Sequence, residues 1–224
     1  MEDSVVAYRA IRAALPENVT LVVVSKTHPV EAIRPVYDAG ARVFGENRVQ
    51  ELLQKKAELP SDIAWHLIGQ LQRNKVKAIL PHAALIHSVA SESLFQEIHK
   101  EAEKMALQPN ILLQVHIAQE ETKSGFSPED ILQFLARWAG KTEPVVIKGL
   151  MGMATFTEDQ TQVQTEFHQL KALFDQIRSA FGKDLPHFQT LSMGMSGDWP
   201  LAVACGSNMV RVGSSIFGHR GSVV

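Results

Sequence analysis

The segment TLVVVSK, residues 20–26, decides the fold that we expect for this chain. It is a nearly continuous run of β-branched side chains that ends in the amine of Lys26. Runs without polar alternation are typical of strands buried on both faces, as in a parallel sheet covered by helices. Ligands of such sheets bind at the carboxyl ends of the strands, where Lys26 falls. An amine at the rim of an apolar pocket is partly desolvated, which favours the neutral form that attacks aldehydes.

The ordinary alternative for Lys26 is that it turns into water, as most lysines after a strand do. The rest of the chain bears on this choice, because strand-like and helix-like segments alternate along it. Predicted strands are 20–25, 42–44, 63–68, 84–89, 111–117, 145–151, 190–193 and 209–212. Predicted helices are 4–15, 29–38, 48–58, 71–80, 91–107, 127–139, 159–181 and 198–204.

Strict alternation of strand and helix argues for a parallel sheet, and eight such units make a closed (β/α)8 TIM barrel the simplest α/β architecture. A doubly wound open sheet is the alternative. Because no linker, repeat or low-complexity tract divides the chain, we expect residues 1–224 to form a single domain.

Composition excludes several classes of function. A formal net charge of -2 gives no reason to expect nucleic acid or an anionic membrane as a partner. Cys205 is the only cysteine, so no internal disulfide can form, which suits a reducing compartment. The sequence has neither an apolar stretch long enough to span a membrane nor a secretion signal at its start. We therefore expect a soluble cytoplasmic protein.

The last two predicted strands are flanked by glycine and serine. SMGMSGD covers 192–198 and GSNMVRVGSS covers 206–215. Such residues ahead of a helix make a nest of backbone N–H groups that suits a phosphate dianion, and phosphate sites of barrels recur after strands seven and eight. The predicted strand 209–212 also carries Arg211, whose guanidinium needs an acceptor if it is desolvated. An ion pair with a core carboxylate is the structural alternative for Arg211.

An amine, a phosphate nest and a buried arginine match the aldehyde, phosphate and ring nitrogen of pyridoxal 5'-phosphate (PLP). The sequence also resembles the pyridoxal phosphate homeostasis proteins over almost its whole length. The shared segments are VVVSKTHPVEAI, FGENRVQE, WHLIGQLQRNK, TKSGF, GLMGMATFTED and LSMGMSGDWPLAVACGSNMVRVGSSIFG. The GLMGMATF segment departs from the usual family pattern, which leaves the rim that it forms undetermined.

The resemblance implies a fold and a set of contacts. The fold is a fold-type III barrel similar to the N-terminal domain of bacterial alanine racemase, without its C-terminal β-domain. Lys26 matches the lysine that carries PLP as a Schiff base, and Arg211 matches the partner of the pyridine nitrogen. Asn47 would border the ring, although as a preferred cap residue it equally suits a helix cap, and His66 is a weaker candidate. The residues implied around the phosphate are Ser192, Met193, Ser196, Gly206 and Ser207.

The same features argue against catalysis. A charged arginine at the ring nitrogen disfavours its protonation, and a neutral pyridine is a poorer electron sink. A racemase also needs a second acid/base, and the two tyrosines, Tyr8 and Tyr37, fall in predicted helices. The resemblance implies a monomeric, non-enzymatic PLP-binding protein in vitamin B6 and amino-acid/keto-acid homeostasis, with PLP-dependent apoenzymes or regulatory proteins as partners.

Three alternatives are enzymes: a low-activity racemase or decarboxylase of this fold, a cofactor-free aldolase that uses Lys26, and a metal-dependent hydrolase. The last is suggested by nine histidines, including His66, His87 and His116 in predicted strands, but no HExxH motif occurs. The remaining charged or sulfur-containing side chains have structural explanations. The segments 50–58 and 97–104 are predicted to be solvated helix faces, and Cys205 is predicted to be a packing residue.

Overall fold

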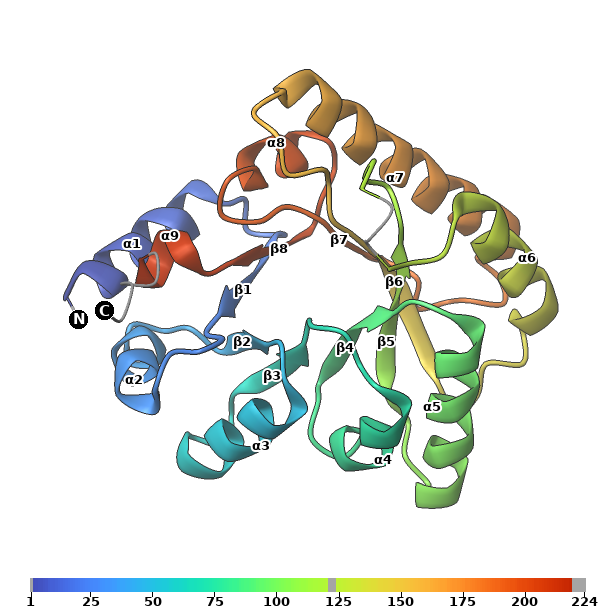
Figure 1. Ribbon diagram of the computed structural model, residues 1–224, viewed down its shortest axis with the longest axis horizontal. Helices are drawn as coiled ribbons and strands as arrows, with labels where there is room; N and C mark the ends of the chain where they lie inside the picture. The colour runs from blue at the N-terminus through green and yellow to red at the C-terminus, as the bar shows by residue number, and fades with distance from the viewer. Residues whose placement is uncertain (1, 121–123, 219–224) are drawn as a thin grey trace.

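The computed structural model describes residues 2–120 and 124–218 and shows a closed barrel of eight parallel strands (Figure 1). The strands are β1 (Thr20–Val24), β2 (Val43–Glu46), β3 (Ala64–Leu67), β4 (Leu85–Val89), β5 (Asn110–Val115), β6 (Val146–Gly152), β7 (Thr190–Ser192) and β8 (Met209–Val212). Because β8 pairs with β1, the sheet has no free edge. The predicted TIM barrel is confirmed and the open sheet is wrong.

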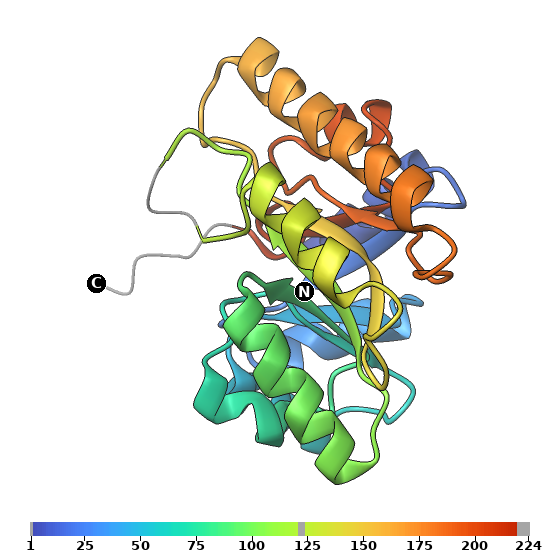
Figure 2. The same ribbon diagram turned by 90° about the vertical axis from the view of Figure 1, so that its right-hand side faces the viewer.

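The helices form the outer ring of the barrel (Figure 1), and Figure 2 shows α5, α6 and α7 along its outside. They are α1 (Glu2–Ala14), α2 (Val30–Asp38), α3 (Val49–Glu58), α4 (Val76–Ile79), α5 (Glu92–Met105), α6 (Pro128–Trp138), α7 (Gln160–Phe181), α8 (Trp199–Ala204) and α9 (Ser214–Phe217). The predicted helix 71–80 is instead a 3-10 turn, η1 (Arg73–Lys75), followed by the single turn of α4. None of the described helices is long and apolar enough to cross a membrane.

Local chemistry explains where several helices begin. The Ser91 hydroxyl accepts the N–H of Leu94 at the start of α5, and the Ser127 hydroxyl accepts that of Asp130 at the start of α6. Asp159 caps α7 in the same way. These side chains satisfy N–H groups that have no partner inside the helix.

The strands separate two apolar cores, since successive side chains point to opposite faces of a strand. The outer core lies between barrel and helices and includes Val23, Trp65 and Leu113. The inner core is a small layer within the barrel. Its buried members are Val22, Leu85, Leu112, Met151 and Met209. Polar side chains follow nearer the carboxyl ends of the strands, so the interior changes from apolar to polar along the barrel axis.

The close approach of β6 and β7 depends on Gly149, whose φ is 151°. A Cβ at this position would lie 1.8 Å from the carbonyl oxygen of Thr190 on β7. Real Cβ atoms do not approach backbone so closely, so any other residue must part the two strands.

We predict that Gly149→Ala lowers the free energy of unfolding by more than about 3 kcal/mol, because backbone strain and a steric clash add. Denaturant unfolding of the purified protein measures this. Gly40→Ala is the matched control, since Gly40 also has a positive φ (110°) but open space around its Cα. We expect the control to lose about 1 kcal/mol. An equal loss in both variants would contradict the steric explanation.

Candidate functional site

A cavity of about 620 Å³ opens at the carboxyl ends of the strands. Four residues singled out in the sequence line it: Lys26, Asn47, Ser196 and Arg211. They follow or belong to β1, β2, β7 and β8, so the barrel gathers them from both ends of the chain. In barrels this end of the strands is where active and binding sites lie.

Lys26 stands two residues beyond the end of β1, and the chain turns outward there because Thr27 adopts a left-handed backbone (φ 66°). The residue before it, Ser25, is still fully buried, whereas Lys26 is exposed. The partial desolvation that we expected for the Lys26 amine is therefore not seen. Its position at the cavity, rather than burial, distinguishes it from an ordinary surface lysine.

Asn47 lines the cavity and is not the cap of α3. The residue at the cap position is Arg48, whose side chain makes no capping hydrogen bond. Gly69 allows the backbone of Asn47 to come close, because a Cβ on Gly69 would lie 2.3 Å from the Asn47 carbonyl oxygen. Asn47 therefore lies at the cavity wall, where β2 and β3 end.

The loops after β7 and β8 meet at Ser196. Its hydroxyl oxygen accepts hydrogen bonds from the backbone N–H groups of Gly213 (3.2 Å) and Ser215 (3.4 Å). Gly197, Gly213 and Ser214 line the cavity beside it. The Ser196 hydroxyl thereby joins the two loops, and glycine- and serine-rich loops of this kind suit the binding of an anion. Residues 213–215 belong to the GSNMVRVGSS segment, in which the resemblance implied Gly206, Ser207 and Arg211 instead.

Four of the residues implied for the phosphate do not line this cavity. Gly206 and Ser207 precede β8, so they lie at the amino end of that strand, away from the post-strand loops. Ser207 is buried, and its hydroxyl lies within 3.2 Å of the carbonyl oxygens of Leu191, Met193 and Met209. Glycine and serine before β8 therefore lie away from the cavity, whereas Gly213 and Ser214 after the strand border it.

Ser192 and Met193 are fully buried, and neither lines the cavity. The Ser192 hydroxyl belongs to a hydrogen-bonded chain that crosses the barrel interior. Arg211 Nη1 donates to Ser192 Oγ (2.6 Å), which lies 3.2 Å from His87 Nδ1, and His87 Nε2 lies 3.0 Å from His66 Nδ1. Arg211 Nη2 also donates to the Gly152 carbonyl (3.0 Å). This chain fixes the guanidinium against the cavity floor.

Arg211 is buried without an ion pair among the described residues, so the predicted core carboxylate partner is not found. Burial lowers the pKa of Arg211 to about 10, against a smaller opposing effect of Asp198, so it stays charged at neutral pH. Burial lowers the pKa of His66 to about 4. Burial, with His66 and Arg211 nearby, holds the pKa of His87 well below its usual value. The chain behind Arg211 is therefore neutral.

A second polar cluster lies behind Lys26. Lys55 Nζ donates to Glu46 Oε1 (2.8 Å), Glu51 Oε1 (2.7 Å) and the Ser25 carbonyl (2.8 Å). Lys55 is buried, so the prediction of a solvated helix face over 50–58 is wrong here, although the i,i+4 pair exists. The periodicity of α3 could not show that its Lys55 face packs on β1 and β2.

Burial raises the pKa of Glu46 to about 7, against the opposing hydrogen bonds from Lys55 and Ser25. Burial also acts on Glu51, but the hydrogen bonds from Lys55 and the Thr27 N–H outweigh it, and the pKa of Glu51 lies below its usual value. Around neutral pH Glu51 is therefore ionised, whereas Glu46 gains or loses its proton.

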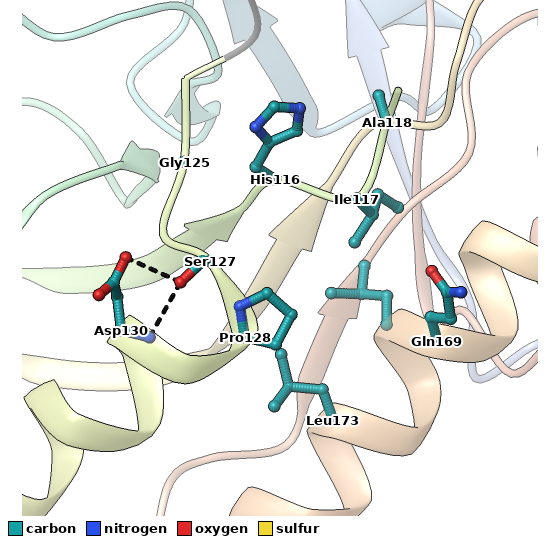
Figure 3. Close-up of a pocket in the computed structure, with 10 residues that line it drawn as sticks. His116, Ile117, Ala118, Gly125, Ser127, Pro128, Asp130, Gln169 and Leu173 are labelled. Carbon is teal, nitrogen blue, oxygen red and sulfur yellow. Dashed lines mark hydrogen bonds between the residues drawn. The ribbon is translucent and has the colours of Figure 1, made fainter. Parts of the chain in front are cut away.

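A smaller cavity of about 340 Å³ lies between the segment after β5 and the helices α6 and α7 (Figure 3). His116 and the cap pair Ser127 and Asp130 are at its edge, and no residue predicted for the cofactor lines it. Within the described residues no group of histidine, cysteine or carboxylate side chains could hold a metal ion. Residues 122 and 123 of the predicted TKSGF segment lie outside the described residues.

We predict that His66 makes the protein acid-sensitive. Because the pKa of His66 is about 4 in the folded state and near 6.5 when unfolded, its contribution to stability is present above pH 6.5 and is lost as pH falls toward 4. His66→Asn keeps an acceptor for His87 but cannot titrate. Between pH 7.5 and 5 we expect its free energy of unfolding to fall by about 2 kcal/mol less than that of the wild type.

Urea unfolding at a series of pH values measures this difference. His187→Asn removes an exposed histidine instead and should keep the wild-type pH dependence. If His66→Asn and wild type share one pH profile, the neutral His66 inferred from its burial is incorrect.

Comparison with known proteins agrees with this architecture. Residues 7–221 match the family model described as "Alanine racemase, N-terminal domain". The pyridoxal phosphate homeostasis protein of Helicobacter pylori J99 is 42% identical over 201 residues, which cover 89% of this chain and 87% of that protein.

Two solved structures of PipY from Synechococcus elongatus PCC7942 are also similar. The structure without PLP has a TM-score of 0.90 and 39% identity, and covers 96% of this chain and 99% of that chain. The structure with PLP bound has a TM-score of 0.87 and 38% identity, and covers 96% of this chain and 100% of that chain. The resemblance seen in the sequence is confirmed: the chain belongs to the pyridoxal phosphate homeostasis proteins, within the alanine racemase N-terminal domain family.

Proposed function

We propose that this protein binds PLP in the cavity at the carboxyl ends of the strands, holds it as a Schiff base on Lys26, and acts in vitamin B6 and amino-acid/keto-acid homeostasis without turning over a substrate. One observation carries the proposal. A lysine, glycine and serine residues of the loops after β7 and β8, and a buried arginine line one cavity of about 620 Å³. These are the three groups that the aldehyde, phosphate and ring nitrogen of PLP require.

The described residues fit the cofactor. The cavity volume lies within the range of about 300–1,000 Å³ typical of small-molecule sites. Arg211 has five N–H donors, and its hydrogen bonds to Ser192 and Gly152 use two of them, which leaves donors for an acceptor in the cavity. Ser196, Gly197, Gly213 and Ser214 would hold the phosphate, with Asn47 beside the ring.

The non-catalytic part of the proposal rests on the charge of Arg211 and on the positions of the tyrosines. When bound, PLP supplies an electrophilic aldehyde and an electron-withdrawing ring. A charged guanidinium at the ring nitrogen keeps a second positive charge away from it, which weakens the ring as an electron sink. Tyr8 is buried in α1, and the hydroxyl of Tyr37 donates to Asp62 on the outside of the barrel. Neither lines the cavity, so neither can serve as the second acid/base of a racemase.

The proposal includes a cytoplasmic location, a monomeric state, and PLP-dependent apoenzymes or regulatory proteins as partners. Its support is the sequence: a single cysteine suits a reducing compartment, and the near-zero net charge gives no reason for a nucleic-acid partner.

We predict that Lys26→Ala abolishes the visible imine absorbance that appears when PLP is added to the purified protein, because Lys26 is the only lysine of the described residues that lines the cavity. Borohydride reduction and mass mapping should find the modified lysine at position 26 in the wild type. Lys104→Ala, which removes an exposed lysine of α5, is the control and should keep the absorbance. Modification of a different lysine, or a wild type that stays colourless, would refute the proposal.

We also predict that the holoprotein does not exchange the α-proton of any amino acid faster than free PLP does. Incubation with each amino acid in deuterated water, followed by mass spectrometry, measures the exchange. Exchange well above the free-cofactor rate would instead favour a low-activity racemase. The Lys26→Ala variant serves as the baseline for contaminating enzymes.

A further inference from the structure

The backbone next to Lys26 is strained. Thr27 has φ 66°, a left-handed conformation that is a genuine outlier for a β-branched residue. Among the described non-glycine residues only Ala106 shares a positive φ, and it ends α5, where left-handed geometry is common. Thr27 has no such helix end to explain it. Strain of this kind persists only where the surroundings enforce it, and it concentrates at functional sites.

Side chains from β2 and α3 enforce the turn. The Thr27 N–H donates to Glu51 Oε1 (2.5 Å) on the far side of Lys26. On the near side, the Ser25 hydroxyl donates to Glu46 Oε1 (2.5 Å) and the Ser25 carbonyl accepts from Lys55 Nζ (2.8 Å). Both neighbours of Lys26 are therefore tied to one cluster, which we name the Glu46–Glu51–Lys55 clamp.

The clamp is rigid because its central cation is fully used. The Lys55 ammonium has three N–H donors, and its three acceptors are Glu46, Glu51 and the Ser25 carbonyl. The side chains of Lys55 and Glu46 are 6% and 0% exposed, so water cannot replace a lost partner cheaply. Its donors are also committed away from the cavity, and Lys26 is the one lysine of the described residues that lines it.

We propose that the Glu46–Glu51–Lys55 clamp is the positioning device of the site: it holds the left-handed turn at Thr27 and so directs the Lys26 amine toward a bound aldehyde. Glu51, which contacts both Thr27 and Lys55, is its key positioning residue. The inference rests on the proposed function, because it assumes that Lys26 is the amine that captures PLP. On this inference the clamp controls how fast and how tightly Lys26 captures PLP.

The test measures PLP capture by the cofactor-free full-length protein in a stopped-flow instrument, together with the equilibrium Kd. Glu51→Ala removes the acceptor of the Thr27 N–H, and we expect capture to slow and weaken by about tenfold or more, as misplaced reacting groups typically cause. Thr27→Gly in the same background should recover most of that loss, since glycine adopts a positive φ without steric cost. A merely structural role of Glu51 would not be rescued in this way.

Matched controls separate the clamp from general effects. Ala106→Gly places a glycine at the other left-handed position and should not rescue Glu51→Ala. Glu58→Gln neutralises an exposed carboxylate on the same helix and should leave capture unchanged. If Glu51→Ala does not fold, Glu51→Asp shortens the side chain by one methylene. We then expect at least about a threefold loss, as the carboxylate no longer spans Thr27 and Lys55, again restored by Thr27→Gly.

The two proposals fail in different ways. If wild-type protein carries PLP on Lys26 and the Glu51 variants capture it within twofold of wild type, the clamp is refuted and the proposed function stands. The same holds if the Glu51 variants lose capture and Thr27→Gly fails to restore it. If the wild type forms no adduct at Lys26, the proposed function itself is refuted.

Discussion

The pairing of β1 with β8 is the constraint on which the site depends. Val23 lies opposite Val212 in this register, so the carboxyl end of the first strand meets that of the last. The two segments are far apart in the chain, and only barrel closure brings Lys26 to the loop after β8. Gly213 permits the approach, because a Cβ there would lie 2.8 Å from the Val24 carbonyl oxygen. Without this contact Lys26 and the loop after β8 would belong to different surfaces.

Side chains inside the barrel form the base of the cavity. An apolar layer near the amino ends of the strands gives way to a polar chain from Arg211 through Ser192 and His87 to His66. Because burial keeps both histidines neutral, the chain supplies hydrogen bonds without adding charge. The chain thereby holds the guanidinium as a cation beneath the cavity, and no carboxylate of the described residues forms an ion pair with it.

Lys26 and Arg211 are held in position by different interactions. Arg211 is buried and is held by hydrogen bonds to Ser192 and Gly152, whereas Lys26 is exposed and its direction is set by its backbone. The Glu46–Glu51–Lys55 clamp fixes that backbone direction, and the backbone of Thr27 is strained as a result. Natural proteins tend to break local conformational rules where function requires it and to compensate nearby. The buried Lys55 is such a compensation, since its hydrogen bonds flank the strained turn.

The sequence by itself determined the order of strands and helices, favoured the barrel over an open sheet, and placed Lys26 after the first strand and Arg211 in the last. These follow from apolar periodicity and capping residues, which act over a few neighbouring positions. The tertiary structure alone decided which glycine and serine residues border the cavity, because that depends on the residue at which β8 begins: Ser207 precedes the strand and Ser214 follows it. The burial of Lys55 was also decided by tertiary structure, because the sequence of α3 is typical of a solvated helix and only its packing against β1 and β2 covers Lys55. Contacts between residues distant in sequence have no local signature, and the cavity and its supports are built from such contacts.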